Sequence, residues 1–272
     1  MNEPLVSIVI PCYKQAQYLP ENLESVLAQT YRNWEAIVVN DGSPDDTEAV
    51  AKDYVGKDSR ISYIYKDNGG PSSTRNVGIS HARGEFILPL DADDVIDARY
   101  VELAVEAFRK NPRLKVVYCQ ALFFGVKQGP WEGLCYRGYK SLLLYNSIFC
   151  SALYRKADWE SIGGYDEKMR DGYEDWEFFI RLLKGGGEVY QIPLPLFRYR
   201  IKEVSMNTHA LERQEDNLLY IYSKHRDAYV SYFCIGGLRD MIMELENLRA
   251  WRKRHQNKWY RKMFSRLGHF FK

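Results

Sequence analysis

Long apolar segments are missing from this sequence. None of its runs approaches the roughly 18 apolar residues that a membrane-spanning helix requires. The first apolar run, residues 5–10, is too short for a signal peptide, and the residues before it carry no basic group. We therefore expect a protein that neither spans a membrane nor carries a cleaved export signal.

Cysteine is scarce and follows no metal-binding or redox pattern. The five cysteines are scattered, and no two form a Cys-x-x-Cys pair. An odd number without paired spacing argues against a disulfide framework and against a zinc site. The sequence predicts reduced thiols and a cytoplasmic protein.

Acidic residues are absent from one end of the chain. Residues 247–272 hold nine Lys or Arg and no Asp or Glu, although the whole chain has a net charge of only +2. The rest of the chain is therefore acidic, with a net charge of −7. An acidic body with a basic tail predicts two different kinds of partner.

Apolar runs alternate with helical spacing through the first 110 residues. Runs typical of buried strands occupy residues 5–10, 34–40, 61–65 and 86–90, and a helical pattern follows each of them. This repeated β-α pattern predicts an α/β fold with a mostly parallel sheet flanked by helices. A P-loop motif and a G-x-G-x-x-G after the first strand are both missing, which excludes two common nucleotide sites.

Polar loops follow the predicted strands where a parallel sheet binds ligands. They comprise residues 11–14, 41–43 and 91–94, with a glycine-rich loop at 68–76 that carries Arg75. Asp91 and Asp93 are two positions apart and would share a face on a continuing strand. Such carboxylates suit a divalent metal that carries phosphates. Taken alone, the motif is explained better by a solvated acidic turn that caps the next helix.

Four ordered motifs together resemble glycosyltransferase family 2. They are VSIVIPCY at residues 6–13, VNDGS at 39–43, NGGPSSTRNVG at 68–78 and LDADD at 90–94. The resemblance covers about residues 5–200 and implies the GT-A fold and inversion at the sugar. It implies a catalytic domain over residues 1–205, with a nucleotide-sugar half to about 110 and an acceptor half from about 111. A helical extension over residues 206–272 follows.

The resemblance also implies roles for the residues of the donor side. Asp93 would bind Mn²⁺ or Mg²⁺, and Asp91 would lie near the ribose or a metal-bound water. The remaining donor contacts would be Pro11 and Tyr13 along the base, Asp41 at the base or ribose, and Arg75 at polar groups of the nucleotide. For Tyr13 a packing role explains the residue nearly as well.

An acidic pair opens a predicted helix in the second half. Glu174 and Asp175 lie in its first turn, where the helix dipole by itself favours negative charge. In the family, the Asp of such a pair is the usual general base, so the resemblance implies that Asp175 accepts the proton of the acceptor hydroxyl. Glu174 would orient it or bind an acceptor hydroxyl.

The segment around residues 197–205 resembles the family part that closes over the diphosphate. Arg200 and Lys202 would meet phosphate there. Family members commonly have His where this chain has Lys202, so a His–metal contact does not carry over. His209 is an alternative, although a lone His is more often structural or exposed.

The resemblance implies metal-dependent transfer of a single sugar, because the Gln-x-x-Arg-Trp segment of processive synthases is absent. A UDP-sugar is the expected donor, and a saccharide or lipid-linked molecule is the expected acceptor. The expected process is cell-surface polysaccharide synthesis. Two other functions stay open. A nucleotidyltransferase would need a Gly-rich basic loop after the first strand, which is missing here. A catalytically silent nucleotide-sugar-binding module is the other.

The tail carries two helical patterns. Apolar residues at roughly heptad spacing between 238 and 248 could pack on the domain or pair two subunits as a homodimer. Residues 260–271 form a basic amphipathic pattern that suits an anionic membrane surface, such as the inner face of a membrane. A packed or disordered tail explains the pattern as well, and the acidic body argues against nucleic acid.

Overall fold

The computed structural model describes residues 3–170, 172–202 and 213–233, and beyond them residues 243, 246, 247 and 250. The strands are β1 (Val6–Cys12), β2 (Trp34–Asp41), β3 (Ile61–Lys66), β4 (Phe86–Pro89), β5 (Val95–Ile96), β6 (Leu114–Gly125), β7 (Gly129–Pro130), β8 (Leu153–Arg155) and β9 (Glu188–Ile201). The helices are α1 (Leu19–Leu27), α2 (Thr47–Lys57), α3 (Pro71–His81), α4 (Tyr100–Lys110), α5 (Tyr139–Leu142), α6 (Lys156–Ser161), α7 (Glu174–Leu183), α9 (Gln214–Lys224) and α10 (Arg226–Tyr232).

The four β-α repeats predicted from the sequence are present. Strands β3, β2, β1 and β4 lie in that order and pair in parallel, with Val6 opposite both Trp34 and Phe86. The side chains of β1, β2 and β4 are almost wholly buried because helices cover both faces of this part of the sheet, whereas those of the edge strand β3 are partly exposed. All four strands therefore end at one edge, and the polar loops follow there.

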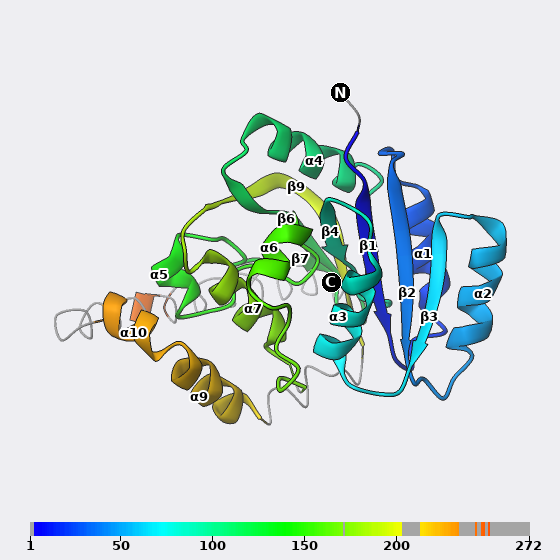
Figure 1. The fold of residues 1–272 in the computed structure, drawn as a ribbon. Coiled ribbons are helices and arrows are strands. Elements are labelled where there is room, and N and C mark those ends of the chain that lie inside the picture. The colour runs from blue at the N-terminus through cyan, green and yellow to red at the C-terminus, as the bar shows by residue number, and fades with distance from the viewer. Residues whose placement is uncertain are drawn as a thin grey trace, which may run out of the picture.

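Helices lie on opposite faces because the strand order reverses after β3. Right-handed crossovers put α1 and α2 on one face and α3 on the other (Figure 1). The first residue of α3 is Pro71, which suits a first helical turn where the N–H has no partner. The reversal between β1 and β4 opens the crevice in which α/β sheets bind ligands.

The second half adds a mixed part to the sheet. Strand β8 runs antiparallel between β4 and β6, whereas β6 pairs with β9 in parallel. Residues 197–201 of the predicted closing segment are the end of β9. The segment after β6 includes the short strand β7, which pairs back with β6 in an antiparallel manner.

Helices α9 and α10 dock on the second half of the fold through a buried charge cluster. Glu177 of α7 is fully buried and contacts Arg181 at 2.7 Å, Lys224 at 2.8 Å and His225 at 3.0 Å. Tyr220 also donates to Asp166 at 2.7 Å. Figure 1 shows both helices beside α7 and α5. Residues 213–233 thus pack against the predicted catalytic domain. His209 and the two tail patterns lie outside the described residues.

Candidate active site

The acidic motif forms a tight turn directly after β4. The backbone N–H of Asp94 donates to the carbonyl of Asp91 at 2.9 Å. From α1, the side-chain amide of Asn22 donates to the carbonyls of Asp91 and Asp94 at 2.9 and 2.8 Å. Sequence reasoning missed Asn22, although a polar residue on the apolar face of a helix was a usable signal. The buried amide fixes the shape of the turn.

Each carboxylate of the turn has a basic or N–H partner. Asp91 accepts from Arg75 at 2.7 Å, and Asp93 contacts Lys202 at 2.5 Å. Asp94 is buried and accepts the backbone N–H of Arg200 at 2.8 Å. Burial raises the pKa of Asp93 while Lys202 opposes that rise, and burial next to Asp93 and Asp91 raises the pKa of Asp94 well above its ordinary value.

Arg75 joins the acidic turn to the acidic pair of the second half. From α3 it donates to Asp91 at 2.7 Å and to Glu174 at 2.6 Å, and its side chain is almost completely buried. The ring of Tyr165 lies 5.6 Å from its guanidinium carbon. Because a buried Arg must be paired, the two carboxylates fix its position, and Arg75 in turn fixes the distance between the two halves.

Asp175 lies at the first turn of α7 with its carboxylate held on one side. Its Oδ1 accepts the backbone N–H of Trp176 at 2.7 Å and the amide of Asn146 at 3.2 Å. Tyr173, just before the helix, adopts a left-handed φ of +63°, which is unusual for a large side chain and is often found at functional sites. Burial and the neighbouring Glu174 raise the pKa of Asp175 to about 7. This value suits a general base near neutral pH.

The carboxylate of Asp41 is buried and already accepts hydrogen bonds from other groups of the protein. Its two carboxylate oxygens accept from Lys66 at 2.6 Å and from the backbone N–H groups of Gly69 and Gly70, both at 2.9 Å. The amide of Asn68 donates to it as well, at 3.1 Å. Asp41 therefore shapes the glycine-rich loop. Its predicted contact with a base or ribose stays a prediction.

The loops after β1 and β2 are tied together. Lys14, which has a left-handed φ of +56°, donates its backbone N–H to Ser43 at 2.6 Å. Tyr13 stands beside it with 41% of its surface exposed, and Pro11 is half-buried in β1. A ring in this position can stack on a base, and this role of Tyr13 stays a prediction.

Arg200 and Lys202 reach the acidic turn from the end of β9. The Nε of Arg200 donates to the carbonyl of Asp93 at 2.8 Å, and its guanidinium forms an ion pair with Glu21 of α1. Lys202 also donates to Gln15 at 3.2 Å. Both predicted phosphate-binding residues thus lie at the turn. Lys202 meets Asp93, the predicted metal ligand.

The chemistry of the turn fits a metal ion that arrives with a diphosphate. Mg²⁺ usually binds one or two carboxylates and takes its other oxygens from phosphate and water. Asp93 is partly exposed and offers one carboxylate, provided that Lys202 moves from it. Among the described residues no three His, Cys, Asp or Glu form a cluster that could hold a metal alone. The donor set therefore fits a shared ion rather than an all-protein cage.

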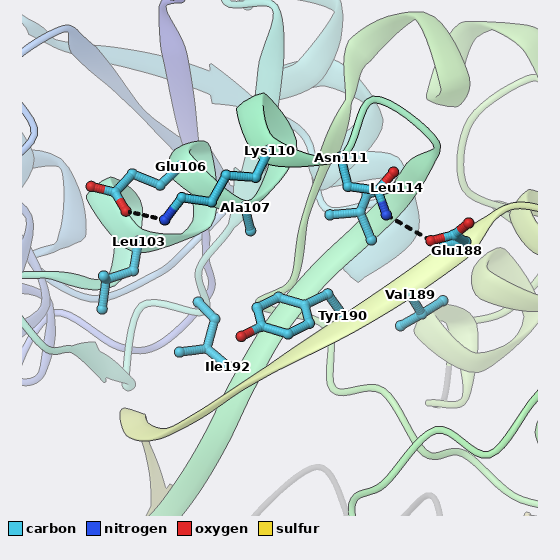
Figure 2. Close-up of a pocket in the computed structure, with 10 residues that line it drawn as sticks. All are labelled: Leu103, Glu106, Ala107, Lys110, Asn111, Leu114, Glu188, Val189, Tyr190 and Ile192. Atoms are coloured by element: carbon cyan, nitrogen blue, oxygen red, sulfur yellow. Dashed lines mark hydrogen bonds and ion pairs between the residues drawn. The ribbon is translucent and has the colours of Figure 1, made fainter.

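A cavity of about 310 Å³ lies elsewhere, between α4 and the start of β9. Figure 2 shows Tyr190 and Ile192 facing it from β9, with the Glu106–Lys110 pair on α4 at its rim. None of the predicted site residues lines it. The candidate site is instead the open edge of the sheet at Asp91–Asp94, which a bound donor would cover.

Comparison with known proteins decides the family. The model of the family Glycosyl transferase family 2 matches residues 7–170, more than half of the chain. The chain belongs to this family. A second model, Glycosyltransferase like family 2, matches residues 134–232, which include α9 and α10. The predicted membership and the glycosyltransferase class of enzyme are confirmed.

Relatives carry the same description. An uncharacterized glycosyltransferase of Rickettsia prowazekii (strain Madrid E) is 33% identical over 228 residues, 78% of this chain and 69% of the relative. Chondroitin synthase of Pasteurella multocida (strain Pm70) is 31% identical over 190 residues, 67% of this chain but only 19% of the synthase. The match to the synthase therefore covers a small part of that protein.

Solved structures confirm the GT-A fold. TarS 1-349 of S. aureus, in complex with UDP-GlcNAc, has a TM-score of 0.65 at 20% identity and covers 84% of this chain and 73% of its own. The mannosyltransferase PcManGT from Pyrobaculum calidifontis, in complex with GDP-Man and Mn²⁺, has a TM-score of 0.65 at 18% identity. The match covers 92% of this chain and 76% of PcManGT. Within the described residues, no helix is long and apolar enough to cross a membrane.

Proposed function

We propose that this chain is an inverting glycosyltransferase that moves a single sugar from a nucleoside-diphosphate sugar to a hydroxyl group. The observation that carries the proposal is the Arg75 bridge, which joins Asp91 of the acidic turn to Glu174 at 2.7 and 2.6 Å. It brings Asp175, whose pKa is about 7, to the sheet edge where a nucleotide would bind. The proposal joins a donor site and a base in one crevice.

The donor is proposed to lie along the ends of β1, β2 and β4. The exposed ring of Tyr13 and the half-buried Pro11 would take the base, and the loop held by Asp41 would take the ribose. Arg200 and Lys202 would contact the diphosphate, because cations meet phosphate strongly in partly buried sites. UDP is the proposed nucleotide, in keeping with the UDP-GlcNAc complex of a structural neighbour.

In the proposed reaction an acceptor hydroxyl oxygen attacks the anomeric carbon as the bond from that carbon to the diphosphate oxygen breaks. The hydroxyl proton passes to Asp175, and the nucleoside diphosphate leaves with the bonding electron pair. A single displacement of this kind inverts the anomeric configuration. Glu174, held by Arg75 at 2.6 Å, is placed to orient an acceptor hydroxyl next to the base.

Asp93 is the proposed protein ligand for Mn²⁺ or Mg²⁺. Asp91 is proposed to contact the same ion, directly or through a metal-bound water. When bound, the cation would neutralise the charge that develops on the leaving diphosphate. A structural neighbour in complex with GDP-Man and Mn²⁺ supports the use of a metal ion, and the choice of ligands rests on the position of Asp93 and Asp91 in the turn. Lys202 is the cation that the chain itself places on Asp93, and we expect it to turn toward phosphate when the donor arrives.

The acceptor is proposed to be a saccharide or a lipid-linked saccharide used in cell-surface polysaccharide synthesis. The basic residues 247–272 would hold the enzyme at an anionic inner membrane face, where such an acceptor lies. The scattered cysteines suit a cytoplasmic setting, and none of the described ones is in a disulfide.

Calorimetric titration of UDP, GDP, dTDP and CDP, with and without Mn²⁺, tests the donor site. We expect one nucleotide to bind in a Mn²⁺-dependent manner and the Asp93→Ala variant to lose that dependence. Lys202→Met should bind Mn²⁺ at least as well as the wild type but the nucleotide more weakly. A folded wild type that binds no nucleotide would contradict the proposal. Binding without any sugar transfer would instead favour a silent nucleotide-sugar-binding module.

A further inference from the structure

The end of α5 and the loop after it run beside the first turn of α7 and are held from two sides. The indole N–H of Trp176 donates to the carbonyl of Leu142 at 2.6 Å, and the hydroxyl of Tyr229 donates to the carbonyl of Leu143 at 2.6 Å. The first donor belongs to α7 and the second to α10. Asn146, further along this loop and half-buried, is therefore presented to α7 by a fixed backbone.

Asn146 contacts only one oxygen of the Asp175 carboxylate. Its Nδ2 donates to Oδ1 at 3.2 Å, and the backbone N–H of Trp176 donates to the same oxygen at 2.7 Å. The Oδ1 of Asn146 accepts the backbone N–H of Ile148 at 3.4 Å, which sets the amide so that its NH₂ faces Asp175. No described residue donates to Oδ2 of Asp175.

We propose that Asn146 is a positioning residue for the transfer reaction: it holds Oδ1 of Asp175 so that Oδ2 faces the acceptor hydroxyl. The proposal rests on the proposed role of Asp175 as the base. Asn146 would not touch substrate in this role. It acts through the carboxylate that it orients.

Two physical effects follow from this contact. The terminal torsion of an Asp side chain is soft, so a second donor on Oδ1 limits its rotation, and misplacement of a catalytic group is costly. A donor to a carboxylate also favours its ionised form. Loss of Asn146 therefore lowers the rate and leaves Asp175 protonated up to a higher pH.

Other groups near Asp175 act on its ionisation and stay in place when Asn146 is changed. Glu174 on α7 raises the pKa of Asp175, and Arg75 on α3 lowers it. Together with burial, the charge of Asp175 in turn raises the pKa of Tyr173, which precedes α7, and the pKa of Cys150, which follows α5. A change in the titration on replacing Asn146 alone is thus separable from the effects of this surrounding set.

The test is the titration of the Asp175 carboxyl, followed by ¹³C NMR on protein labelled at Asp Cγ and assigned by its loss in Asp175→Asn. In Asn146→Ala the midpoint should rise by about one pH unit, the size expected for one lost hydrogen bond to a charge. In Asn146→Asp, which keeps the shape but adds a like charge, it should rise further. Tyr145→Phe, a change in the same loop, should leave the midpoint in place.

The rate of nucleoside diphosphate release from the active nucleotide sugar is the second readout. In Asn146→Ala the acidic limb of its pH profile should move up with the NMR midpoint, and the rate at pH 7 should fall roughly tenfold with donor binding unchanged. Unchanged midpoints and limbs in both Asn146 variants would overturn the proposal. Full activity of Asp175→Asn would instead overturn the base assignment, whatever Asn146 does.

Discussion

At the scale of single residues, the same environment that suits Asp175 for proton transfer makes it costly for folding. Its side chain is half-buried next to Glu174, so its ionised form is disfavoured in the folded state. Arg75 offsets part of this, since it pairs with Glu174 and Asp91. A residue kept under such conditions is typical of a functional site.

The stability of the Asp175→Asn variant should reveal this cost. The folded carboxyl has a pKa of about 7 against an ordinary value of 3.8, so it stays protonated in the native state where the unfolded chain is ionised. The wild type therefore loses stability as the pH rises through this window, and the Asn variant does not. We expect Asp175→Asn to be more stable by roughly 4 kcal/mol at pH 8, at about 1.4 kcal/mol for each unit of pKa difference, and equal at pH 4.

Urea unfolding at the two pH values measures that difference. Asp53→Asn on α2, which removes a carboxylate from an exposed ion pair with Lys57, is the matched control and should change little at either pH. The raised pKa would be ruled out if the difference in unfolding free energy between Asp175→Asn and the wild type were no larger at pH 8 than at pH 4.

At the scale of secondary-structure elements, α7 serves two purposes. Its first turn carries Glu174 and Asp175, and one turn later Glu177 faces α9 and α10. Hydrogen bonds from His225 and Arg181 outweigh the effect of burial and lower the pKa of Glu177 to about 2. This buried charge is therefore one of the contacts that dock the two helices, beside the hydrogen bonds from Tyr220 to Asp166 and from Tyr229 to Leu143.

Replacement of Glu177 by Gln should destabilise the protein in a pH-dependent way. Three basic side chains would lose their shared carboxylate, at a cost of roughly 3 kcal/mol at pH 7. The depressed pKa stabilises the wild type above the ordinary Glu value, and this contribution disappears as the pH falls from about 5 to 2. The two proteins should therefore converge in acid.

Urea unfolding at pH 7 and pH 3 checks this. Glu160→Gln, on the exposed i,i+4 pair with Lys156, is the control and should cost less than about 0.5 kcal/mol. The assigned role of the cluster would be contradicted if the free energies of unfolding of Glu177→Gln and the wild type differed little at pH 7. It would also be contradicted if they differed by the same amount at both pH values.

The elements were largely predictable and the contacts between them were not. Apolar runs and helical patterns located the four β-α repeats, because these patterns reflect local burial. The Arg75–Glu174 contact joins residues 99 positions apart, and nothing local to either residue reports it. The same holds for Asn146 and Asp175, which the packing of the loop after α5 against α7 brings together, and for Lys66 and Asp41, which pair across β2 and β3. Asn22 is the exception, since its place on an apolar face was visible.

At the scale of the whole molecule, the chain combines an acidic body with a basic C-terminal segment. The body provides the proposed donor and acceptor sites along one edge of the sheet. The basic segment provides the proposed attachment to an anionic surface, where each Lys or Arg near the surface contributes about 1 kcal/mol. The two parts would act together if the acceptor is lipid-linked.

Liposome flotation tests the attachment. The full chain should float with vesicles rich in phosphatidylglycerol, remain behind with neutral vesicles, and detach at high salt. A chain truncated at Asn247 should not float. Lys52→Gln with Lys57→Gln on α2, which removes basic residues elsewhere, should leave flotation unchanged. Equal flotation of the full and truncated chains would refute the attachment.

The most direct test of the central claim is nucleoside diphosphate release from a panel of nucleotide sugars with Mn²⁺ and simple glycoside acceptors, for the wild type and Asp175→Asn. The wild type should release one nucleotide, with a rate that rises with pH around 7. By calorimetry, Asp175→Asn should bind the donor as well as the wild type does. It should release the nucleoside diphosphate about a hundredfold more slowly. Release at the wild-type rate by Asp175→Asn, or no release by a folded wild type, would contradict the account.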